Sequence, residues 1–291
     1  MKSAIVFGAS GQDGYYLNSL LIKQGIMVYL ISRNNSPIQG DIANYPFVES
    51  YIKKIVPDFI FHFASVSNIN HKFLIENHNS ISIGTINILE AVKTYAPNAR
   101  VFLSGSAEQF KNDNLPISET TKFEAKSSYA AERIYSTYLG RYFRNKYNIK
   151  VYIGYFFHHD SPLRKENHLN KKIINFVKSL DVDNKKPLIL GDYNIEKEFN
   201  FSGDFMEAVW KLINQDEIFE CVIGSGKPHK IIDWLDLAFN KIQQNWEDWV
   251  ETDSNFTPPY EKLYSNPSKI MSLGWKPKND ICSLFNLMYD S

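Results

Sequence analysis

The sequence predicts an α/β protein, in which a doubly wound parallel sheet is followed by a smaller α/β region. Over residues 1–155, short continuous apolar runs alternate with amphipathic stretches of helical period. This pattern is typical of parallel strands that are buried on both faces. Beyond residue 160, short strand-like and helix-like segments mix without that alternation. The two observations separate a main sheet from a C-terminal region of different construction.

Five apolar runs are the expected strands of the main sheet, at residues 4–7, 26–31, 59–63, 101–103 and 151–155. The helical spacing of apolar residues predicts the helices between them, at residues 15–23, 45–55, 84–94 and 128–147. Strands and helices that alternate in this way produce a parallel sheet with helices on both faces.

The later segments are expected as helices at residues 168–180, 205–213 and 231–245 and as strands at residues 187–191 and 221–224. We expect residues 1–165 to form the main domain, with residues 200–225 returning to it. Residues 166–199 and 226–291 would then form the smaller region.

The composition excludes several classes of protein. Hydrophobic residues make up 44% of the chain and charged residues 22%, which is ordinary for a globular protein. The formal net charge is zero, so a broad basic field for nucleic acid is absent. Cys221 and Cys282 are far apart, which excludes a disulfide scaffold and a cysteine zinc site. No apolar run reaches the length of a membrane span, and we expect a soluble, cytoplasmic protein with no bound metal.

A glycine-rich turn follows the first strand directly and opens the first helix, with the sequence Gly8-Ala9-Ser10-Gly11-Gln12-Asp13-Gly14. A turn of this kind lets the backbone approach a pyrophosphate and points amide N–H groups and the helix dipole at it. Three glycines so close together also occur in ordinary tight turns. The strand before the turn and the helix after it favour dinucleotide binding.

The end of the second strand indicates which dinucleotide. A site for NAD usually places an acidic residue there for the ribose 2′-hydroxyl, whereas an arginine suits the 2′-phosphate of NADP. This chain has Arg33 and no acid at the strand end. NADP is therefore the expected cofactor, and the alternative is a solvated surface arginine with NAD bound.

Candidate catalytic residues follow the fourth strand, where ligands bind in such sheets. Ser106 and Glu108 lie just beyond the strand, and Tyr129 begins the next helix with Arg133 four residues later. That spacing places Tyr129 and Arg133 on one helix face. A fixed cation beside a phenol favours the phenolate, which suits proton exchange with a hydroxyl or a ketone. Alone, the Tyr129 and Arg133 spacing also fits a surface pair. Ser106 alone also fits a strand-end turn, and Glu108 alone also fits a solvated acid.

Together these segments resemble the extended short-chain dehydrogenase/reductase superfamily, which is the NAD-dependent epimerase/dehydratase group, and most closely its GDP-mannose 4,6-dehydratases. The resemblance begins at the glycine turn with Gln12-Asp13 and continues over nearly the whole chain. Its further segments are 40–42, 57–60, 63–65, 84–92, 157–162 with Arg164, Glu166, Asn167 and 171–173, then 190–204, 222–226, 266–269 and 273–277.

The resemblance implies a Rossmann dinucleotide-binding domain of the extended type, a substrate-binding C-terminal region, a homodimer formed through helices 84–94 and 128–147, and a role in deoxysugar and surface-glycan biosynthesis. It also implies a redox-neutral dehydration. Hydride would pass from C4 of the hexose to NADP+ while Tyr129 accepts the hydroxyl proton. Glu108 would remove the C5 proton, water would leave from C6, and the hydride would return there. Ser106 would hydrogen-bond the reacting sugar oxygen.

The same resemblance implies two sets of binding residues. The cofactor-binding set is Gly8, Ser10, Gly11, Gln12, Asp13, Gly14, Arg33, Asp41, Ile42, Phe63, Ala64, Ser65, Tyr129, Arg133 and His159. The substrate-binding set, for a nucleotide sugar with GDP-mannose as the first candidate, is Ser67, His158, Lys172 and Lys197.

The chain also departs from the family pattern. Arg133 stands in place of a lysine, His158 in place of an asparagine, and Lys197 and Phe256 in place of arginines. Lysine is a compact point charge and guanidinium is planar and bulkier, so the ribose contact of Arg133 differs from that of the family lysine. Arg33 and Asp41 are only eight positions apart in the sequence, closer than in typical family members. We therefore expect that this chain lacks a helix and a loop that those members have.

Three functions stay open at this stage. The first is an NADP-dependent nucleotide-sugar 4,6-dehydratase, and the second is an NADPH-dependent 4-ketoreductase or epimerase that acts on its product. The third is a nucleotide-sugar-binding homologue without catalysis. Glu108 favours the first over the second, because ketone reduction needs no C5 base. A lysine in place of Arg133 should raise activity if the site is merely damaged.

Overall fold

The computed structural model describes residues 1–166, 168–181, 183 and 186–291. Asn167, one of the residues in the resemblance, lies outside these ranges. Strand β1 (Ser3–Phe7) runs through the middle of the molecule with both faces covered. Ala4 and Val6 point into one core, and Ile5 and Phe7 point into another. This explains why the strand reads as a continuous apolar run.

The main sheet has seven strands in the order β11-β6-β5-β4-β1-β2-β3, and all its pairings are parallel. From β1 the chain moves outward to β2 and β3, then crosses back to the other side of β1 for β4, β5 and β6. The doubly wound parallel sheet predicted from the sequence is confirmed. The bounds of the other six strands are β2 (Met27–Ser32), β3 (Ile38–Gln39), β4 (Phe59–His62), β5 (Arg100–Ser106), β6 (Lys150–Phe156) and β11 (Glu220–Ile223).

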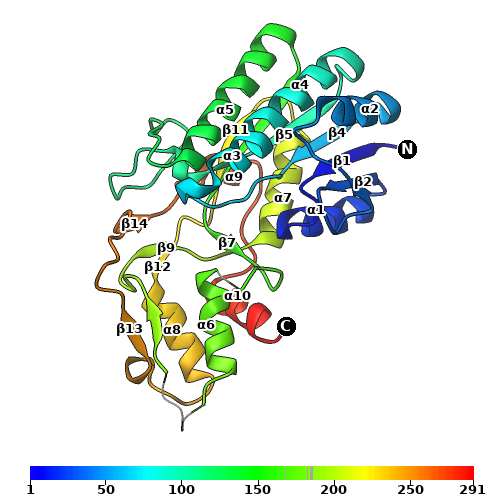
Figure 1. The fold of residues 1–291 in the computed structure, drawn as a ribbon. Helices are drawn as coiled ribbons and strands as arrows, with labels where there is room; N and C mark the ends of the chain where they lie inside the picture. The colour runs from blue at the N-terminus through cyan, green and yellow to red at the C-terminus, as the bar shows by residue number, and fades with distance from the viewer. Residues whose placement is uncertain (167, 182, 184–185) are drawn as a thin grey trace.

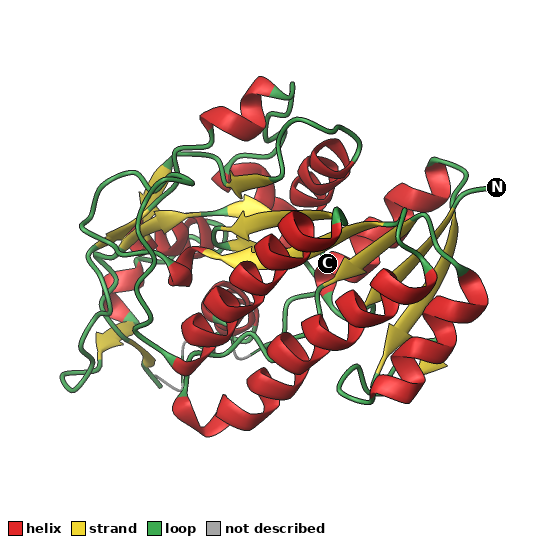
Figure 2. Ribbon diagram, turned by 90° about the horizontal axis from the view of Figure 1, so that it is seen from above, coloured by secondary structure: helices red, strands yellow, loops and turns green. Residues whose placement is uncertain are grey.

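Helices cover both faces of the sheet (Figure 2). One layer supplies the core that contains Ile5 and Phe7, and it consists of α2 (Tyr45–Ile55), α4 (Gly84–Tyr95) and α5 (Ser128–Tyr147). The opposite layer supplies the core that contains Ala4 and Val6, and it consists of α1 (Gln12–Lys23), α7 (Ser202–Ile213) and α9 (Ser268–Ser272). The sequence did not predict the irregular helical segment before α4, which is η1 (His71–Phe73), α3 (Leu74–Asn77) and the π-helical η2 (His78–Ile83).

A third hydrophobic core lies beyond the sheet, in the lower half of Figure 1. Trp234, Leu235 and Phe285 are at its centre, and each is almost fully buried. The helices around it are α6 (Leu169–Lys178), α8 (Ile231–Asn240) and α10 (Ile281–Tyr289). Its short strands are β8 (Leu188–Leu190) paired with β13 (Val250–Thr252), and β9 (Glu196–Glu198) between β12 (Pro228–Lys230) and β14 (Lys262–Leu263).

Small pieces complete the path of the chain. The short strands β7 (His159–Asp160) and β10 (Asn200–Phe201) pair in parallel, and single turns form η3 (Ala107–Gln109) and η4 (Trp246–Asp248).

Three expected helix boundaries were wrong by three residues or more. The first helix begins at Gln12 and α7 begins at Ser202, each three residues earlier than expected, and the helix expected over 231–245 ends at Asn240. Gln243 adopts a left-handed φ of 57°, which cannot continue an α-helix. In the described residues, none of the helices combines the length and the apolar character that a membrane span requires.

Candidate active site

The glycine turn joins β1 to α1 and packs tightly on its neighbours. The N–H groups of Gly8 and Ala9 both donate to the Ile31 carbonyl, at 2.9 and 3.2 Å. Gly8 has a left-handed φ of 85°, and a Cβ there would lie 2.5 Å from the Ala64 backbone nitrogen. No other residue fits this position without moving the segment that follows β4. The turn therefore holds α1 with its first N–H groups, which lack helical acceptors, facing the ends of the strands.

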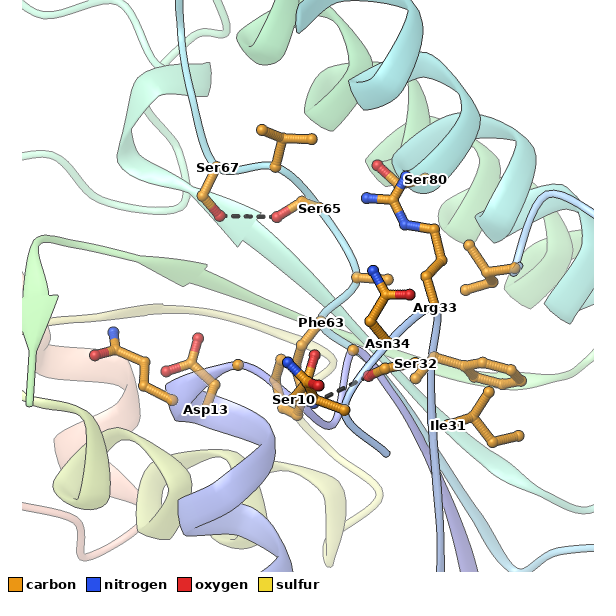
Figure 3. A pocket seen from close by; sticks show the side chains of 18 of the residues that line it. Ser10, Asp13, Ile31, Ser32, Arg33, Asn34, Phe63, Ser65, Ser67 and Ser80 are labelled. Carbon is orange, nitrogen blue, oxygen red and sulfur yellow. Dashed lines mark hydrogen bonds between the residues drawn. The ribbon is translucent and has the colours of Figure 1, made fainter. Parts of the chain in front are cut away.

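A cavity of about 400 Å³ lies against this turn, at the carboxyl ends of the strands (Figure 3). Most of the expected cofactor-binding residues line it, together with one expected substrate residue. They are Gly8, Ser10, Gly11, Gln12, Asp13, Arg33, Ile42, Phe63, Ala64, Ser65 and Ser67. Ser10 N donates to Ser32 Oγ at 2.9 Å, and the hydroxyls of Ser65 and Ser67 lie 2.8 Å apart.

Five expected cofactor residues are not part of this lining: Tyr129 and Arg133, which are described below with β5, and Gly14, Asp41 and His159. Gly14 sits below the turn, where a Cβ would lie 2.6 Å from the Ala9 Cα, so its role is close packing. The Asp41 carboxylate accepts the N–H of Ala43 at 2.9 Å. His159 lies behind Asp13, to which it is hydrogen-bonded.

The lining also contains residues that the sequence did not indicate. Asn34 and Asn35 extend the wall that begins at Arg33, and Ser80 comes from η2. Leu163, Arg164, Lys165 and His168 reach the cavity from the connection after β7. Arg164 belongs to a segment of the resemblance, and that was the signal that could have found it.

The charged side chains that line the cavity are one acid and several cations. The only acidic lining residue in the described part of the chain is Asp13. The Asp13 carboxylate already accepts bonds from His159 and Ser202. The Arg33 side chain is exposed and has no hydrogen bond or ion pair to any described residue. A free cation at the end of β2, without a competing acid, fits a 2′-phosphate.

Asp13 and His159 form a partly buried charged pair behind the turn. His159 Nε2 lies 3.0 Å from Asp13 Oδ1, and Ser202 Oγ donates to the same oxygen at 2.7 Å. Burial would raise the pKa of Asp13, but the charge and hydrogen bond of His159 hold it below its usual value. Burial would lower the pKa of His159, but Asp13 raises it above its usual value. The pair is therefore stabilised in its ionised form.

Ser106 and Glu108 lie side by side at the carboxyl end of β5. The Ser106 hydroxyl accepts the N–H of Glu108 at 3.3 Å, and Ser106 N donates to Gln109 Oε1 at 2.7 Å. This capping arrangement fixes η3 at the strand end. Burial raises the pKa of the Glu108 carboxyl, and the charge of Lys126 opposes that effect only in part. Glu108 is thus suited to taking up a proton.

Tyr129 and Arg133 are both buried in the first turns of α5, with 8% and 3% of their surface exposed. The helix is capped by Ser127, whose hydroxyl accepts the N–H of Ala130 at 3.1 Å. Arg133 Nε donates to the Tyr129 hydroxyl oxygen at 3.1 Å. Its Nη1 donates to Ser104 Oγ at 2.8 Å and also to the Ser104 carbonyl. The expected same-face pair is therefore present and is attached to β5.

A second charged cluster is buried beside β7, around Asp160. The Asp160 carboxylate lies 3.0 Å from His158 Nε2 and 2.6 Å from Arg164 Nε, and it accepts the Asn170 amide at 2.7 Å. Burial favours the protonated acid, but the charges around it hold the pKa of Asp160 well below its usual range. Burial and the charge of Lys197 lower the pKa of His158 to about 4.

Lys197 completes this cluster without a carboxylate of its own. Its Nζ lies 3.3 Å from His158 Nε2, and burial lowers the pKa of Lys197 to about 8. Since Asp160 is ionised, we assign the His158 proton to Nε2, where it donates to Asp160. That nitrogen then has no lone pair for Lys197. In the described ranges, no carboxylate lies within ion-pair distance of Lys197, so its ammonium group is open to an anionic ligand.

Lys172 is not brought into this cluster. Its Nζ donates to the Ile189 carbonyl at 2.7 Å, at the surface of the β8–β13 pair. Phe256 lies nearby, because a Cβ on Gly191 would meet its ring at 2.7 Å. The Lys172 ammonium thus already has one acceptor and keeps two further protons.

No group of three His, Cys, Asp or Glu side chains that could hold a metal ion occurs in the described residues. The expected site residues thus fall into three connected groups. The cofactor cavity adjoins β4, the Tyr129–Arg133 pair is attached to β5, and the Asp160 cluster shares Arg164 with the cavity lining. Lys172 stands apart.

A family model described as GDP-mannose 4,6 dehydratase matches residues 5–288 of this chain. The chain is 29% identical to GDP-mannose 4,6 dehydratase 1 of Arabidopsis thaliana, over 99% of this chain and 89% of that protein. It is 25% identical to GDP-mannose 4,6 dehydratase of Homo sapiens, over 94% of this chain and 87% of that protein.

Solved structures show the same fold. A dTDP-glucose 4,6-dehydratase from Bacillus anthracis in complex with NAD has a TM-score of 0.86 at 16% identity and covers 100% of this chain and 96% of that chain. A UDP-glucose 4-epimerase from Thermus thermophilus in complex with NAD has a TM-score of 0.83 at 18% identity and covers 99% of this chain and 98% of that chain.

Proposed function

Since this chain belongs to the GDP-mannose 4,6 dehydratase family, we propose that it is an NADP-dependent nucleotide-sugar 4,6-dehydratase. Its product would be a 4-keto-6-deoxy sugar nucleotide, and GDP-mannose is the first substrate to test. Relatives named for that reaction cover nearly the whole chain. The proposal goes beyond the family on two points, the identity of the sugar nucleotide and the choice of NADP over NAD.

The observation that carries the proposal is the position of Glu108. Its carboxyl follows the same strand end as Ser106, and burial raises its pKa. Reduction of a ketone needs a proton-exchanging tyrosine but no second base, whereas loss of water across C5 and C6 needs a group that takes the C5 proton. A carboxyl whose environment favours proton uptake supports the dehydratase.

We assign the first proton transfer to Tyr129. Its phenolate would accept the proton of the hexose C4 hydroxyl, and Arg133 Nε donates a hydrogen bond to this oxygen at 3.1 Å. The Ser106 hydroxyl would donate to the same sugar oxygen and fix its orientation. When bound, the nicotinamide supplies a hydride acceptor that later gives the hydride back.

We assign the second proton transfer to Glu108. Once C4 is a ketone, the C5 hydrogen is acidic, and the carboxylate would remove it while water departs from C6. The burial that raises the pKa of Glu108 strengthens it as a base for this step. Tyr129 and Glu108 would together take up two protons. One of them would leave with the C6 hydroxyl as water, and the other would return to C5 when the hydride is added to C6, so the proton balance closes.

We assign the cofactor to the cavity along the glycine turn. The N–H groups at the start of α1 would face the pyrophosphate. Arg33 would pair with a 2′-phosphate, because it lines the cavity and is free of acidic partners in the described residues. The absence of a competing carboxylate at the end of β2 supports NADP.

We assign the diphosphate of the substrate to Lys197. It is buried and its Nζ has no carboxylate partner among the described residues, so an anion would relieve the cost of burying its charge. His158, which is neutral at pH 7, would contribute a polar edge beside it. Lys172, which is bonded to the Ile189 carbonyl, is the less suitable of the two lysines.

We also propose that the enzyme is a cytoplasmic homodimer. Tyr135, Tyr138 and Tyr142 are each about half exposed and lie along one side of α5, at the spacing of a helix stripe. Such a stripe on a long helix is suited to packing against a second copy. Light scattering of the purified protein tests this, and a mass of one chain would contradict it.

The test of the activity is to incubate the protein with NADP+ and a panel of nucleotide sugars, GDP-mannose first, and to follow product masses. We expect one substrate to lose one water with no net formation of NADPH. If no mass changes, the panel is replaced by a 4-keto-6-deoxy sugar nucleotide with NADPH. A gain of two hydrogens would then show a ketoreductase, and no change would show a binding protein.

A further inference from the structure

Ser104 links two strands and the guanidinium of Arg133. Its hydroxyl donates to the His62 carbonyl at 2.8 Å and accepts from Arg133 Nη1, also at 2.8 Å. Ser104 and Arg133 are both buried, with 5% and 3% of their surface exposed. The hydroxyl has one proton to give and gives it to β4, so it presents a lone pair to the arginine. Its orientation is therefore determined from both sides.

The surroundings leave the charge of Arg133 unneutralised. His62 is the titratable group beside it, and burial together with the Arg133 charge lowers the pKa of His62 to about 3. His62 is thus neutral at physiological pH. Arg133 donates its hydrogen bonds to the Ser104 carbonyl, the Ser104 hydroxyl and the Tyr129 oxygen. In the described residues, no carboxylate forms an ion pair with this guanidinium, so its full charge acts on Tyr129.

The two contacts also fix the plane of the guanidinium. Nε points to Tyr129 and Nη1 points to Ser104, so rotation about the side chain breaks at least one bond. A lysine ammonium is a single point charge without this fork. It cannot satisfy both acceptors through two separate nitrogen atoms.

We propose that Ser104 is a positioning residue that holds the Arg133 guanidinium on the Tyr129 oxygen. The site is then adapted to arginine at position 133, because Ser104 binds its guanidinium. Arginine is not a defective replacement for lysine here. The kinetic part of this inference rests on the proposed dehydration, whereas the contact itself does not. A lysine at position 133 should therefore lower activity, the opposite of what a damaged site predicts.

The experiment is a double-mutant cycle of Ser104→Ala and Arg133→Lys, read in two ways. The first readout is NMR of protein labelled with ¹³Cζ-tyrosine, in which the signal that Tyr129→Phe removes belongs to Tyr129. The second is kcat and KM of the dehydration. The matched control is Ser136→Ala. It removes a buried hydroxyl from α5, the helix that carries Arg133, and breaks the 2.8 Å contact of this hydroxyl with Thr85.

We expect Ser104→Ala to shift the Tyr129 signal and to lower kcat about tenfold with little change in KM. In the Arg133→Lys background, Ser104→Ala should cause less than half of the wild-type shift of the Tyr129 signal and less than half of the wild-type change in log kcat. Ser104→Thr, which keeps the hydroxyl, should restore most of the wild-type behaviour. Ser136→Ala should lower the melting temperature without moving the Tyr129 signal or kcat.

Three outcomes would overturn the inference. They are additive effects of the two substitutions on the Tyr129 signal, a higher kcat in Arg133→Lys, and a Ser104→Ala variant that differs only in melting temperature. If wild type dehydrates none of the sugars in the panel, the proposed function fails, but the NMR cycle still decides whether Ser104 holds Arg133.

Discussion

His159 Nε2 lies 3.0 Å from Asp13 Oδ1, and this contact joins two parts of the chain that are 146 residues apart. Asp13 belongs to the first turn of α1, which opens from the glycine turn, and His159 begins β7. A second bond, from Ser161 Oγ to Gln12 Oε1 at 2.8 Å, runs alongside the first. The glycine turn is thus tied to the segment that carries His158 and Arg164. Both contacts reach the cofactor cavity, because Gln12 and Asp13 are among its lining residues.

This pair makes stability depend on pH in a known direction. The pKa of His159 is raised in the folded protein, so above its ordinary value of 6.5 the folded state binds more protons than the unfolded state. The free energy of unfolding should therefore fall as the pH rises from 6.5 through the raised pKa. Asp13→Asn removes the carboxylate that raises the pKa of His159, so this fall in the free energy of unfolding should disappear. Urea unfolding at pH 6 to 9 measures it, and parallel curves for the two proteins would contradict the assignment.

Arg33 should determine the choice of cofactor. Arg33→Ala removes the free cation at the end of β2, so the Kd for NADP should rise at least about tenfold while the Kd for NAD stays unchanged. Isothermal titration with both cofactors measures this, and NAD binding serves as the internal control. Equal weakening of both, or of neither, would show that Arg33 does not contact a 2′-phosphate.

Glu108→Gln should stop the reaction after the first hydride transfer. The amide cannot accept the C5 proton, so overall turnover should fall by about 10²- to 10⁴-fold. Reduced cofactor should then accumulate on the enzyme and absorb at about 340 nm, up to one equivalent per site. Tyr129→Phe is the contrast, because it lacks the first proton acceptor and should show neither turnover nor reduced cofactor. Wild-type rates in Tyr129→Phe would remove Tyr129 from the mechanism.

The backbone at Val56 offers a stability test away from the site. Val56 ends α2 in the left-handed region with a φ of 47°, and its side chain is 57% exposed. A β-branched residue is strained in that conformation, whereas asparagine tolerates it, as Asn148 does at the end of α5. Val56→Asn should raise the free energy of unfolding by about 1 kcal/mol, measured by urea unfolding. Val56→Ala, which keeps a Cβ, should gain less.

The sequence predicted the fold because the strands of the main sheet carry their signal locally. Six of the seven strands contain a predicted apolar run, and the glycine turn is a short continuous motif. The exception is β3, a two-residue edge strand with a polar residue, which the sequence did not predict. The family match over residues 5–288 confirms the resemblance. Of the small strands, the sequence predicted β8 within residues 187–191. It did not predict β7 and β10, which have two residues each and pair only with each other.

The candidate site was predictable in its residue types and not in its contacts. Tyr129 and Arg133 are close in sequence, so helical spacing was enough to pair them. The hydrogen bond between Ser104 and Arg133 joins residues 29 positions apart and depends on how α5 packs on β5. The contact between Lys197 Nζ and His158 Nε2 spans 39 residues. Such contacts between distant segments leave no periodic pattern in the sequence.

Glu198 provides the sharpest test of how the C-terminal region is held together. Its carboxylate is fully buried and accepts bonds from Ser225 N at 2.6 Å, Gly226 N at 3.1 Å and Ser265 N at 2.6 Å. The hydroxyls of Ser225 and Ser265 and the amide of Asn200 donate to it as well. One side chain on β9 thus connects the loop after β11 with the segment after β14.

Glu198→Gln should destabilise the protein strongly, because its amide NH₂ would face N–H donors and leave at least one of them unsatisfied. We expect a loss of about 3 kcal/mol in the free energy of unfolding. Glu196→Gln is the matched control on the same strand. Glu196 pairs with Lys262 at 2.8 Å, but both side chains are about one-third exposed, so its loss should cost under about 0.5 kcal/mol. Equal urea midpoints for the two variants would show that the Glu198 contacts do not hold these loops.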